Sequence, residues 1–249
     1  MYQFFVEPGQ IREDEKKVFI TGSDVNHIKN VLRMKTGEEI AVSNGIDGRE
    51  YRCAIRTMDE GAVECELLFI KEDGVELPVR VTLFQGLPKA DKMELIIQKA
   101  VELGACEIVP VATRRCVVKL DEKKAASKCA RWQSIAEAAA KQSKRGMIPV
   151  VGDVCSFGKA LDRAGEMDVR VIPYELAEGM NRTREILSGI RPGQSVAVFI
   201  GPEGGFDPEE IEKAKEAGVE PITLGKRILR TETAGMTVLS WLGYLLEQS

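Results

Sequence analysis

Two short segments near the C-terminus combine glycines with charged side chains in a pattern suited to binding a small molecule. The first, Gly201–Phe206, has the sequence Gly-Pro-Glu-Gly-Gly-Phe and directly follows the apolar run Val196–Ile200. The second, Leu224–Ala234, carries two arginines and a Thr-Glu-Thr sequence before an apolar helical pattern. Glycine lets the backbone approach a ligand closely and adopt positive φ. Ligands of open α/β sheets bind beyond the carboxyl ends of the strands, so we expect a small-molecule site at 201–206.

Neither segment matches the common nucleotide-binding loops. The glycine segment is not a Walker loop, because no Gly-Lys-Ser/Thr sequence follows it, and it is not a GxGxxG motif with an acidic residue at the dinucleotide position. A glycine-rich turn alone is also compatible with an ordinary structural turn. The prediction of a site therefore depends on the two segments together.

The histidine and cysteine content argues against several kinds of site. The chain has one histidine, His27, and six cysteines without a CxxC pair. This content argues against a histidine-rich metal site and a Ser-His-Asp triad, and His27 is either a surface or packing residue or a functional one. Scattered cysteines in a chain of this length are typical of reduced thiols in the cytosol. We therefore expect a cytoplasmic protein without a metal.

The charge and hydropathy patterns argue against a membrane protein and against a uniformly basic nucleic-acid binder. No apolar run approaches the roughly 18 residues of a membrane span, the N-terminus lacks the order of a signal peptide, and the net charge is −4. The segment 114–145, however, has ten Lys and Arg against three Asp and Glu, a local charge of +7. Such a segment attracts phosphates or is simply a solvated helix face.

The first 70 residues are predicted to form mostly strands. The β-prone runs are Tyr2–Val6, Glu39–Ser43, Tyr51–Thr57 and Ala62–Ile70. One helix is expected to interrupt them, beginning near Ser23 or Asp24 and ending near Gly37. The polar segment Lys71–Pro78 contains Gly and Pro, and it marks the predicted boundary between domains at 1–72 and 73–249.

Beyond this boundary, strands alternate with helices, which is typical of a mainly parallel sheet. The predicted strands are Val79–Gln85, Glu107–Ala112, Val169–Pro173, Val196–Ile200 and Ile222–Leu224. The predicted helices are Lys89–Leu103, Asp121–Ser143, one that begins after Asp207 and ends at Gly218, and Glu232–Glu247. The sequence Asp207-Pro-Glu-Glu210 is a strong helix start, with Asp as N-cap, Pro at the first helical position and Glu at the third.

With these motifs the sequence resembles the RsmE family of bacterial RNA methyltransferases, which methylate N3 of a uridine in 16S rRNA and belong to the SPOUT superfamily. The resemblance covers nearly the whole chain. The matching positions are His27-x-x-x-Val31-Leu-Arg33, Gln98–Gly104, Arg114–Cys116, Arg131-Trp132, Glu137–Ser143, Arg145, Ile200–Phe206 and Leu224–Ala234. The family often has an arginine in its first few residues, whereas the first arginine here is Arg12, so no RNA contact is assigned there.

The resemblance implies a PUA-like RNA-binding β-barrel at 1–72 and a C-terminal α/β methyltransferase domain at 73–249 whose chain forms a trefoil knot. It also implies S-adenosylmethionine as cofactor, a homodimer, and 16S rRNA in the small ribosomal subunit as substrate. Two other hypotheses stay open, because a fold does not fix a substrate. The chain could be a SPOUT methyltransferase acting on another rRNA or tRNA position, or a non-catalytic RNA-binding protein.

The resemblance also places the cofactor against three loops, largely through backbone groups. The carried-over residues are Ile172, Pro173, Tyr174, Glu175, Ile200, Gly201, Glu203, Gly204, Gly205, Leu224, Gly225, Ile228, Leu229, Thr231 and Thr233. The side chains of Ile200, Leu224 and Leu229 would enclose the adenine faces. Gly201, Gly204 and Gly225 would admit the ligand against the main chain.

Methylation of an imide nitrogen requires that N3 be oriented and that its proton leave. Arg230 is predicted to stabilise the uracil oxygens, and Glu203 or Glu232 to accept the proton if burial raises its pKa. The structural alternative is that Glu203 and Arg230 form an ion pair that holds the knot together. The predicted RNA contacts are His27, Arg33, Arg114, Arg115, Arg131, Lys144 and Arg145.

Overall fold

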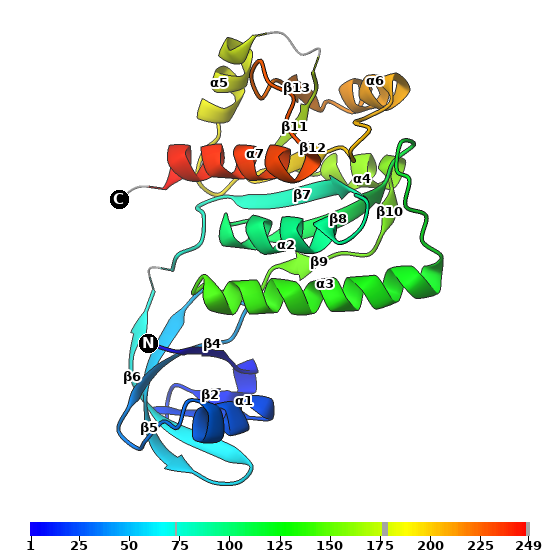
Figure 1. Ribbon diagram of the computed structural model, residues 1–249. Coiled ribbons are helices and arrows are strands. Elements are labelled where there is room, and N and C mark those ends of the chain that lie inside the picture. The colour runs from blue at the N-terminus through cyan, green and yellow to red at the C-terminus, as the bar shows by residue number, and fades with distance from the viewer. Residues whose placement is uncertain (73, 176–178, 248–249) are drawn as a thin grey trace. The chain divides into compact units, whose positions relative to one another are not determined.

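The computed structural model describes residues 1–72, 74–175 and 179–247, which fold into two units (Figure 1). Unit 1 comprises Met1–Glu76 and Ala140–Ile148, and unit 2 comprises Leu77–Ala139 and Pro149–Ser249. The division predicted from the sequence, 1–72 and 73–249, does not place 140–148 with the N-terminal unit. Residue 73, at the predicted boundary, lies outside the described residues.

In the described part of unit 1, six strands form one curled sheet in the order β1-β4-β5-β6-β3-β2. The β1–β4 pair is parallel, and the other neighbours are antiparallel. Register shifts after Arg52 and Ile55 bend the β5–β6 ladder, so that the sheet encloses its own apolar core. The strands are β1 (Gln3–Phe5), β2 (Ile11–Arg12), β3 (Lys17–Thr21), β4 (Glu39–Ser43), β5 (Glu50–Met58) and β6 (Ala62–Lys71).

The helix of unit 1 is shorter than the sequence predicts. Helix α1 (Ser23–Asn26) continues as a single π-helical turn over His27–Val31. Arg33 adopts φ 53°, a left-handed conformation that stops the helix before Gly37. The prediction also missed β3, whose alternating Val18 and Ile20 are buried in the core.

A segment from the middle of the chain completes unit 1. The Ile148 N–H donates to the Gly45 carbonyl at 2.9 Å, and Gln3 Nε2 donates to the Arg145 carbonyl at 2.7 Å. Gly146 lies so close to Gly48 that any side chain there would collide with the Gly48 carbonyl. The segment 140–148 is thus an integral part of the N-terminal fold.

In the described part of unit 2, seven strands form a parallel sheet. Its order is β10-β8-β7-β12-β11-β13, and β9 also pairs with β8. The strands are β7 (Arg80–Gly86), β8 (Glu107–Ala112), β9 (Val150–Val151), β10 (Cys155–Ser156), β11 (Val169–Pro173), β12 (Ser195–Ile200) and β13 (Glu220–Ile222). The helices are α2 (Lys92–Glu102), α3 (Glu122–Gln142), α4 (Phe157–Ala164), α5 (Met180–Ser188), α6 (Pro208–Glu216) and α7 (Thr231–Leu246).

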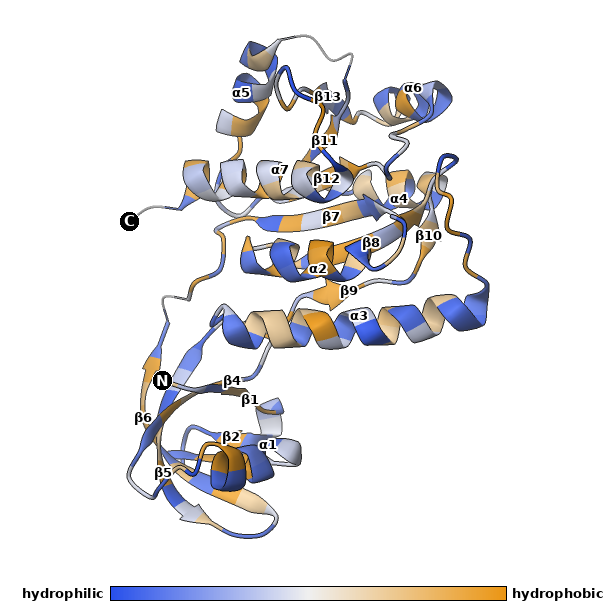
Figure 2. Ribbon diagram, viewed as in Figure 1, coloured by the Kyte–Doolittle hydropathy of each residue, from blue (hydrophilic) through white to orange (hydrophobic). Residues whose placement is uncertain are grey.

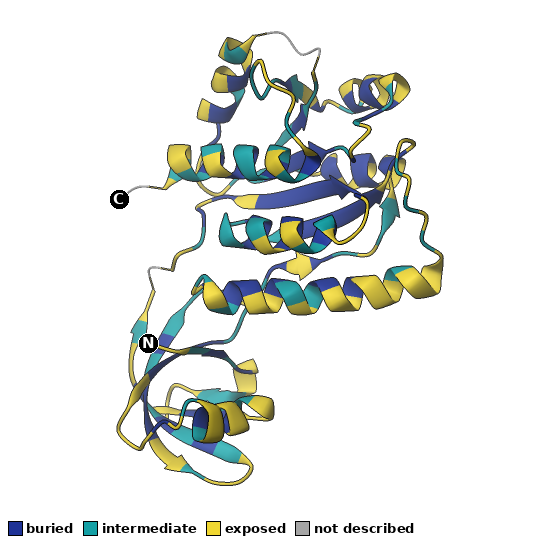
Figure 3. Cartoon of the chain, in the orientation of Figure 1, coloured by how far each residue is buried: buried dark blue, intermediate teal, exposed yellow. Residues whose placement is uncertain are grey.

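The central strands β7, β8 and β12 are apolar and buried almost throughout (Figures 2 and 3). This is expected of parallel strands covered on both faces. Phe84 of β7 and Phe199 of β12 stack with ring centroids 4.6 Å apart. The strands that lead to the candidate site therefore rest on a rigid core.

The path of the C-terminal chain positions the last helix. From β13, at the edge of the sheet, the chain returns so that α7 packs against α2 and β12. The Cβ that Gly235 of α7 lacks would lie 3.7 Å from Ile200 Cγ1 and 3.8 Å from both Leu83 methyls, so this helix contacts the sheet at its glycine. The predicted trefoil knot stays a prediction.

Candidate active site

The three segments predicted to hold a cofactor follow adjacent parallel strands, β12, β11 and β13. The carboxyl ends of parallel strands lie at the same edge of a sheet, so the structure brings these segments together. The Tyr174 N–H donates to the Ile222 carbonyl at 2.9 Å, and Thr231 Oγ1 donates to the Gly201 carbonyl at 2.6 Å. The first bond joins the segment after β11 to strand β13, and the second joins the segment after β13 to the segment after β12.

Gln85, at the end of β7, extends this network and was not predicted. Its Nε2 donates to Thr231 Oγ1 and to the Gly86 carbonyl, both at 2.9 Å. Its Oε1 is buried and has no hydrogen-bond partner among the described residues. An unsatisfied buried acceptor is costly, and a donor from a bound molecule would satisfy it.

The glycines at 201 and 204 serve a purpose other than the predicted one. A Cβ on Gly201 would lie 3.0 Å from the Gly205 carbonyl carbon and 3.3 Å from a ring carbon of Phe206. A Cβ on Gly204 would lie 3.2 Å from Arg115 Cβ. The space beside these glycines is filled by protein: Gly201 lets the loop close on itself, and Gly204 lets Arg115 pack against the loop.

Gly205 and Gly225, in contrast, border open space. They have φ of 66° and 100°, and among the described residues no atom beyond the two chain neighbours lies within 4 Å of the position that a Cβ would occupy on either residue. Their backbone therefore borders space that a ligand could occupy, and the cofactor contact of Gly225 stays a prediction.

The other predicted cofactor residues differ in exposure. Ile172 and Ile200 have buried side chains, 0 % and 2 % exposed, and Ile200 packs toward Gly235 of α7. Their side chains thus belong to the core, and only their main chain is left for a ligand. Pro173, Tyr174, Leu224 and Leu229 are partly buried, whereas Glu175, Ile228 and Thr233 are exposed.

The two predicted proton acceptors, Glu203 and Glu232, share one ammonium group. Lys92 Nζ lies 3.0 Å from Glu203 Oε1 and 3.6 Å from Glu232 Oε2. The Lys89 N–H also donates to both Glu203 oxygens, at 3.1 and 3.3 Å. The predicted alternative of a Glu203–Arg230 pair is therefore wrong, because Glu203 pairs with Lys92.

The pKa of Glu203 shifts opposite to the prediction. Burial alone would raise this pKa, but hydrogen bonds from its own backbone and from Lys92 and Lys89 lower it overall. A carboxylate held ionised in this way is a poor proton acceptor. Glu232 differs, because its Oε2 is buried and receives no hydrogen bond from the described residues.

Arg230 stands at the start of α7 as its N-cap residue. Its main-chain carbonyl accepts from the Ala234 N–H at 2.9 Å. The residue is exposed, and its guanidinium has no hydrogen bond or ion pair among the residues that the structure describes. The guanidinium is therefore available to a substrate.

Arg114 and Arg115, predicted as RNA contacts, are engaged with the glycine loop and α6. Arg115 donates to the Gly204 carbonyl at 3.1 Å, and both side chains pair with Asp207. The Arg114 N–H donates at 2.9 Å to Glu210, which is buried and forms the predicted capping box with Asp207. These contacts anchor the loop that follows β12.

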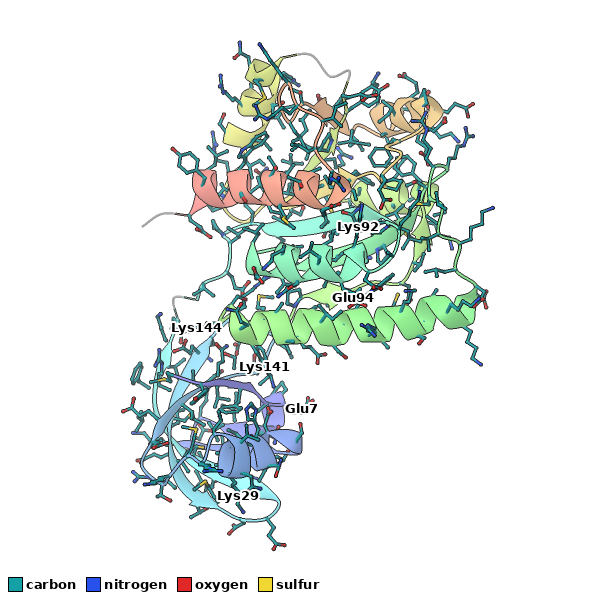
Figure 4. The ribbon with its side chains drawn as sticks, in the orientation of Figure 1. Glu7, Lys29, Lys92, Glu94, Lys141 and Lys144 are labelled. Carbon is teal, nitrogen blue, oxygen red and sulfur yellow. The ribbon has the colours of Figure 1, made fainter. Side chains whose placement is uncertain are left out.

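The +7 charge of 114–145 is largely neutralised by residues outside that window. Arg131 pairs with Glu94 of α2 at 2.7 Å, and Figure 4 labels this glutamate. Within unit 1, Lys141 pairs with Asp24 at 3.1 Å. The predicted phosphate attraction of this segment is therefore weaker than its charge count suggests.

Arg145 and Lys144, both predicted as RNA contacts, have opposite environments. The Arg145 side chain is 3 % exposed and forms an ion pair with Glu76, so the prediction of an RNA contact is wrong for Arg145. Its guanidinium is buried inside unit 1. Lys144 is exposed, has φ 60°, and is labelled in Figure 4.

His27 and Arg33 lie in unit 1, at the π-helical turn and just after it. The imidazole of His27 meets the Phe4 ring edge-on, with centroids 6.3 Å apart, and both His27 and Arg33 are exposed. The structure places them in a different unit from the cofactor segments.

Sequence reasoning missed Gln85 and Lys92, and it left Lys226 and Arg227 unassigned. Lys226 and Arg227 are exposed, and neither has an ion-pair partner among the described residues. With Arg230 they make the loop before α7 positively charged. A signal for Lys92 was available in its position, because a cation at a helix N-terminus opposes the helix dipole.

The described residues contain no group of three or more His, Cys, Asp or Glu side chains placed to hold a metal ion. Within the same residues, none of the helices is long and apolar enough to cross a bilayer.

Comparison with protein families gives two matches that together span most of the chain. Residues 75–243 match the RNA methyltransferase domain, and residues 20–68 match the RNA methyltransferase PUA domain. The fold is thus an α/β methyltransferase with a parallel sheet, joined to an N-terminal PUA-like unit.

Full-length relatives share both parts. The ribosomal RNA small subunit methyltransferase E of Bacillus subtilis is 40 % identical, with 99 % of this chain and 98 % of the relative covered. The Neisseria gonorrhoeae protein of the same name, solved with bound S-adenosyl methionine, superposes with a TM-score of 0.82 at 31 % identity, covering 98 % of this chain and 97 % of its own. A crystal structure described as a hypothetical protein has a TM-score of 0.90 at 39 % identity, with 98 % of both chains covered. The chain therefore belongs to the ribosomal RNA small subunit methyltransferase E family.

Proposed function

We propose that this protein transfers a methyl group from S-adenosylmethionine to N3 of a uridine in the 16S rRNA of the small ribosomal subunit. The observation that carries the proposal is the convergence of the segments after β11, β12 and β13, which contain the family motifs, at one edge of the sheet. The relatives named above, and the cofactor bound to the Neisseria gonorrhoeae protein, support it. The proposed domains are an RNA-binding unit at 1–72, which the segment 140–148 completes, and the methyltransferase in the rest of 73–249, in a cytoplasmic homodimer.

The residues at this edge fit S-adenosylmethionine. Gly205 and Gly225 present backbone beside open space, and the unsatisfied Gln85 Oε1 offers an acceptor to a hydroxyl or amine. Leu224 and Leu229 are partly buried and can cover a flat base. When bound, the cofactor supplies a methyl group on a sulfonium, an electrophile suited to a ring nitrogen.

The protein's own residues act on the uracil. The unpaired Arg230 guanidinium donates to the uracil oxygens and stabilises the negative charge that develops as the N3 proton leaves. Glu232 accepts that proton, because its buried Oε2 receives no hydrogen bond from the described residues, whereas hydrogen bonds from its own backbone, Lys92 and Lys89 lower the pKa of Glu203. Glu203 instead serves, through Lys92 and Lys89, to hold the loop after β12.

Replacing Gly205 with asparagine should lower the affinity for S-adenosylmethionine at least about tenfold. Asparagine tolerates the left-handed conformation that Gly205 adopts, so it fills the open space with little strain. Calorimetry measures the affinity. Gly193→Asn is the matched control, since Gly193 also has positive φ and open space but precedes β12. Equal affinities in both variants would exclude Gly205 from the site. Gly201→Val is not a suitable test, because a side chain at Gly201 would strain the loop itself.

Replacing Lys226 and Arg227 together with glutamine should reduce the salt dependence of RNA binding. We propose that these exposed, unpaired cations contact RNA phosphates beside the target base. Each lost single-strand contact lowers the slope of log K against log salt by roughly 0.7, so the pair should lower it by about 1.4. Lys213→Gln/Lys215→Gln on α6 removes the same charge as a control. The same slope in the wild type and the Lys226/Arg227 variant would show that the loop does not contact phosphates.

The proposed homodimer accounts for apolar side chains left exposed on α7. Tyr244 is 87 % exposed and Leu245 44 % exposed, and a second copy of the chain that packs on this part of α7 would cover them. Analytical ultracentrifugation of the full chain would report the oligomeric state.

The function is tested by incorporation of labelled methyl groups from S-adenosylmethionine into defined RNAs. Small subunits from cells that lack this activity should become labelled, whereas transfer RNA should not. Labelling of transfer RNA alone would favour another SPOUT substrate. S-adenosylmethionine binding without any labelling, or no binding at all, would favour a non-catalytic RNA-binding protein.

A further inference from the structure

Lys92 occupies a position where a cation is unfavourable for its own helix. It is the first residue of α2, and the N-terminus of a helix carries partial positive charge. Its side chain is 29 % exposed and its ammonium lies between Glu203 and Glu232. The attraction of the two carboxylates offsets the repulsion between the Lys92 ammonium and the helix dipole. Both carboxylates lie outside α2, so Lys92 serves contacts with other segments and not its own helix. Figure 4 labels the residue.

The chain just before Lys92 is directed at the same carboxylate. The Lys89 N–H donates to both oxygens of Glu203. The next residue, Ala90, has φ 54°, a left-handed conformation that a residue with a Cβ rarely adopts. Such local strain persists only where surrounding contacts fix it. The turn between β7 and α2 is therefore built around Glu203.

The two carboxylates belong to different parts of the candidate site. Glu203 lies in the loop after β12, two residues before Gly205. Glu232 lies in the first turn of α7, two residues after Arg230. One ammonium therefore joins the cofactor loop to the helix that carries the predicted catalytic arginine.

We propose that Lys92 is a positioning residue, which holds the loop after β12 at Glu203 and the start of α7 at Glu232 and thereby orients Arg230 toward the substrate. The inference rests on the proposed function. An isolated surface ion pair has little effect, but here the side chains of Glu203 and Glu232 are only 28 % and 17 % exposed, and three chain segments share one cation.

The two carboxylates that share Lys92 differ in their hydrogen bonds. Glu203 accepts from Lys92 and from the Lys89 N–H, whereas Glu232 Oε2 receives no hydrogen bond from the described residues. One positive charge against two negative charges leaves Glu232 incompletely neutralised.

The test compares Lys92→Met with Lys92→Arg in single-turnover methylation of small subunits at saturating S-adenosylmethionine. Displacement of catalytic groups by about an ångström costs up to roughly a hundredfold in rate, so Lys92→Met should slow transfer by about ten- to a hundredfold, and Lys92→Arg should recover most of it. Lys99→Met is the matched control, since Lys99 lies on the same helix and pairs with Glu102. It should transfer at the wild-type rate.

A double-variant cycle separates positioning from general stability. If Lys92 acts through Glu203, adding Glu203→Gln to Lys92→Met should slow transfer far less than Glu203→Gln does in the wild type. This double variant also restores the charge balance; if Lys92→Met alone unfolds, the double variant is compared directly with Glu203→Gln, and the two should transfer methyl groups at similar rates. Additive losses, or a Lys92→Met rate equal to that of Lys99→Met, would overturn the inference. A wild-type protein that transfers no methyl group would instead refute the proposed function.

Discussion

Replacing Arg230 with alanine should lower the single-turnover rate of methyl transfer by about a hundred- to a thousandfold, the loss typical for one donor to a developing oxyanion. The affinity for S-adenosylmethionine should change little, because the guanidinium has no partner among the described residues and is exposed. Rapid-quench measurements of methyl transfer, together with calorimetry, separate the two quantities. Arg230→Lys should restore little, since an ammonium cannot match the planar fork of a guanidinium.

Arg227→Ala is the control for this prediction. Arg227 is an exposed arginine of the same loop without an ion-pair partner in the described part of the chain. At saturating RNA, Arg227→Ala should transfer methyl groups at close to the wild-type rate, although it binds RNA more weakly. If Arg230→Ala and Arg227→Ala behave alike, Arg230 has no special part in the chemical step.

Replacing Arg145 with methionine should lower the free energy of unfolding by about 3 kcal/mol, the lower end of the cost of breaking a buried ion pair. The Arg145 side chain is 3 % exposed, and its loss leaves the Glu76 carboxylate, 18 % exposed, without that cation. Denaturant unfolding measures the change. RNA affinity at temperatures where the variant is folded should stay at the wild-type value, because the guanidinium is not on the surface.

Arg131→Met provides the comparison. Arg131 also pairs with a glutamate, Glu94, but its side chain is 68 % exposed, and such pairs contribute up to about 1 kcal/mol. Adding Glu76→Gln to Arg145→Met should recover part of the loss, since the unpaired carboxylate is then removed. Equal destabilisation by Arg131→Met and Arg145→Met would contradict the assignment of Arg145 to the interior of unit 1.

The same ion pair bears on how the protein can be divided. A fragment that starts near Leu77 would keep 140–148 but lose Glu76 and Gln3, the partners of Arg145 within unit 1. A domain boundary at 72/73 implies that such a fragment folds by itself. We expect the fragment to be destabilised instead, because 140–148 has lost the unit into which it packs. Experiments on the role of the N-terminal unit are better made by point substitution in the full chain.

Local signals in the sequence predicted much of the fold. The apolar runs gave β8 and β11 with their observed bounds, and Asp207-Pro-Glu-Glu210 predicted the capping box of α6. The prediction missed α4, although Ser156 caps it and its buried residues follow a helical period. The strands β9 and β10 have two residues each, which is too short for a periodic pattern.

The site was harder to predict, because its contacts join residues far apart in the chain. The glycines of the loop showed that the backbone there has a special environment. They did not show whether the space beside each glycine is filled by protein, as at Gly201, or open, as at Gly205. Counting charge within 114–145 gave +7 because Glu94 and Asp207, which pair with arginines of this segment, lie outside it. The sequence left Glu203 as a proton acceptor on the condition that burial raised its pKa, but hydrogen bonds from its own backbone, Lys92 and Lys89 lower that pKa.

The most direct test of the proposed function is the chemical identity of the methylated nucleoside. Small subunits from cells lacking this activity would be incubated with the purified protein and S-adenosylmethionine, and their 16S rRNA digested to nucleosides for chromatography and mass spectrometry. The proposal predicts N3-methyluridine, formed by the wild-type protein and strongly reduced with Arg230→Ala. A methyl group on another atom of uridine, on the ribose or on another base would contradict it.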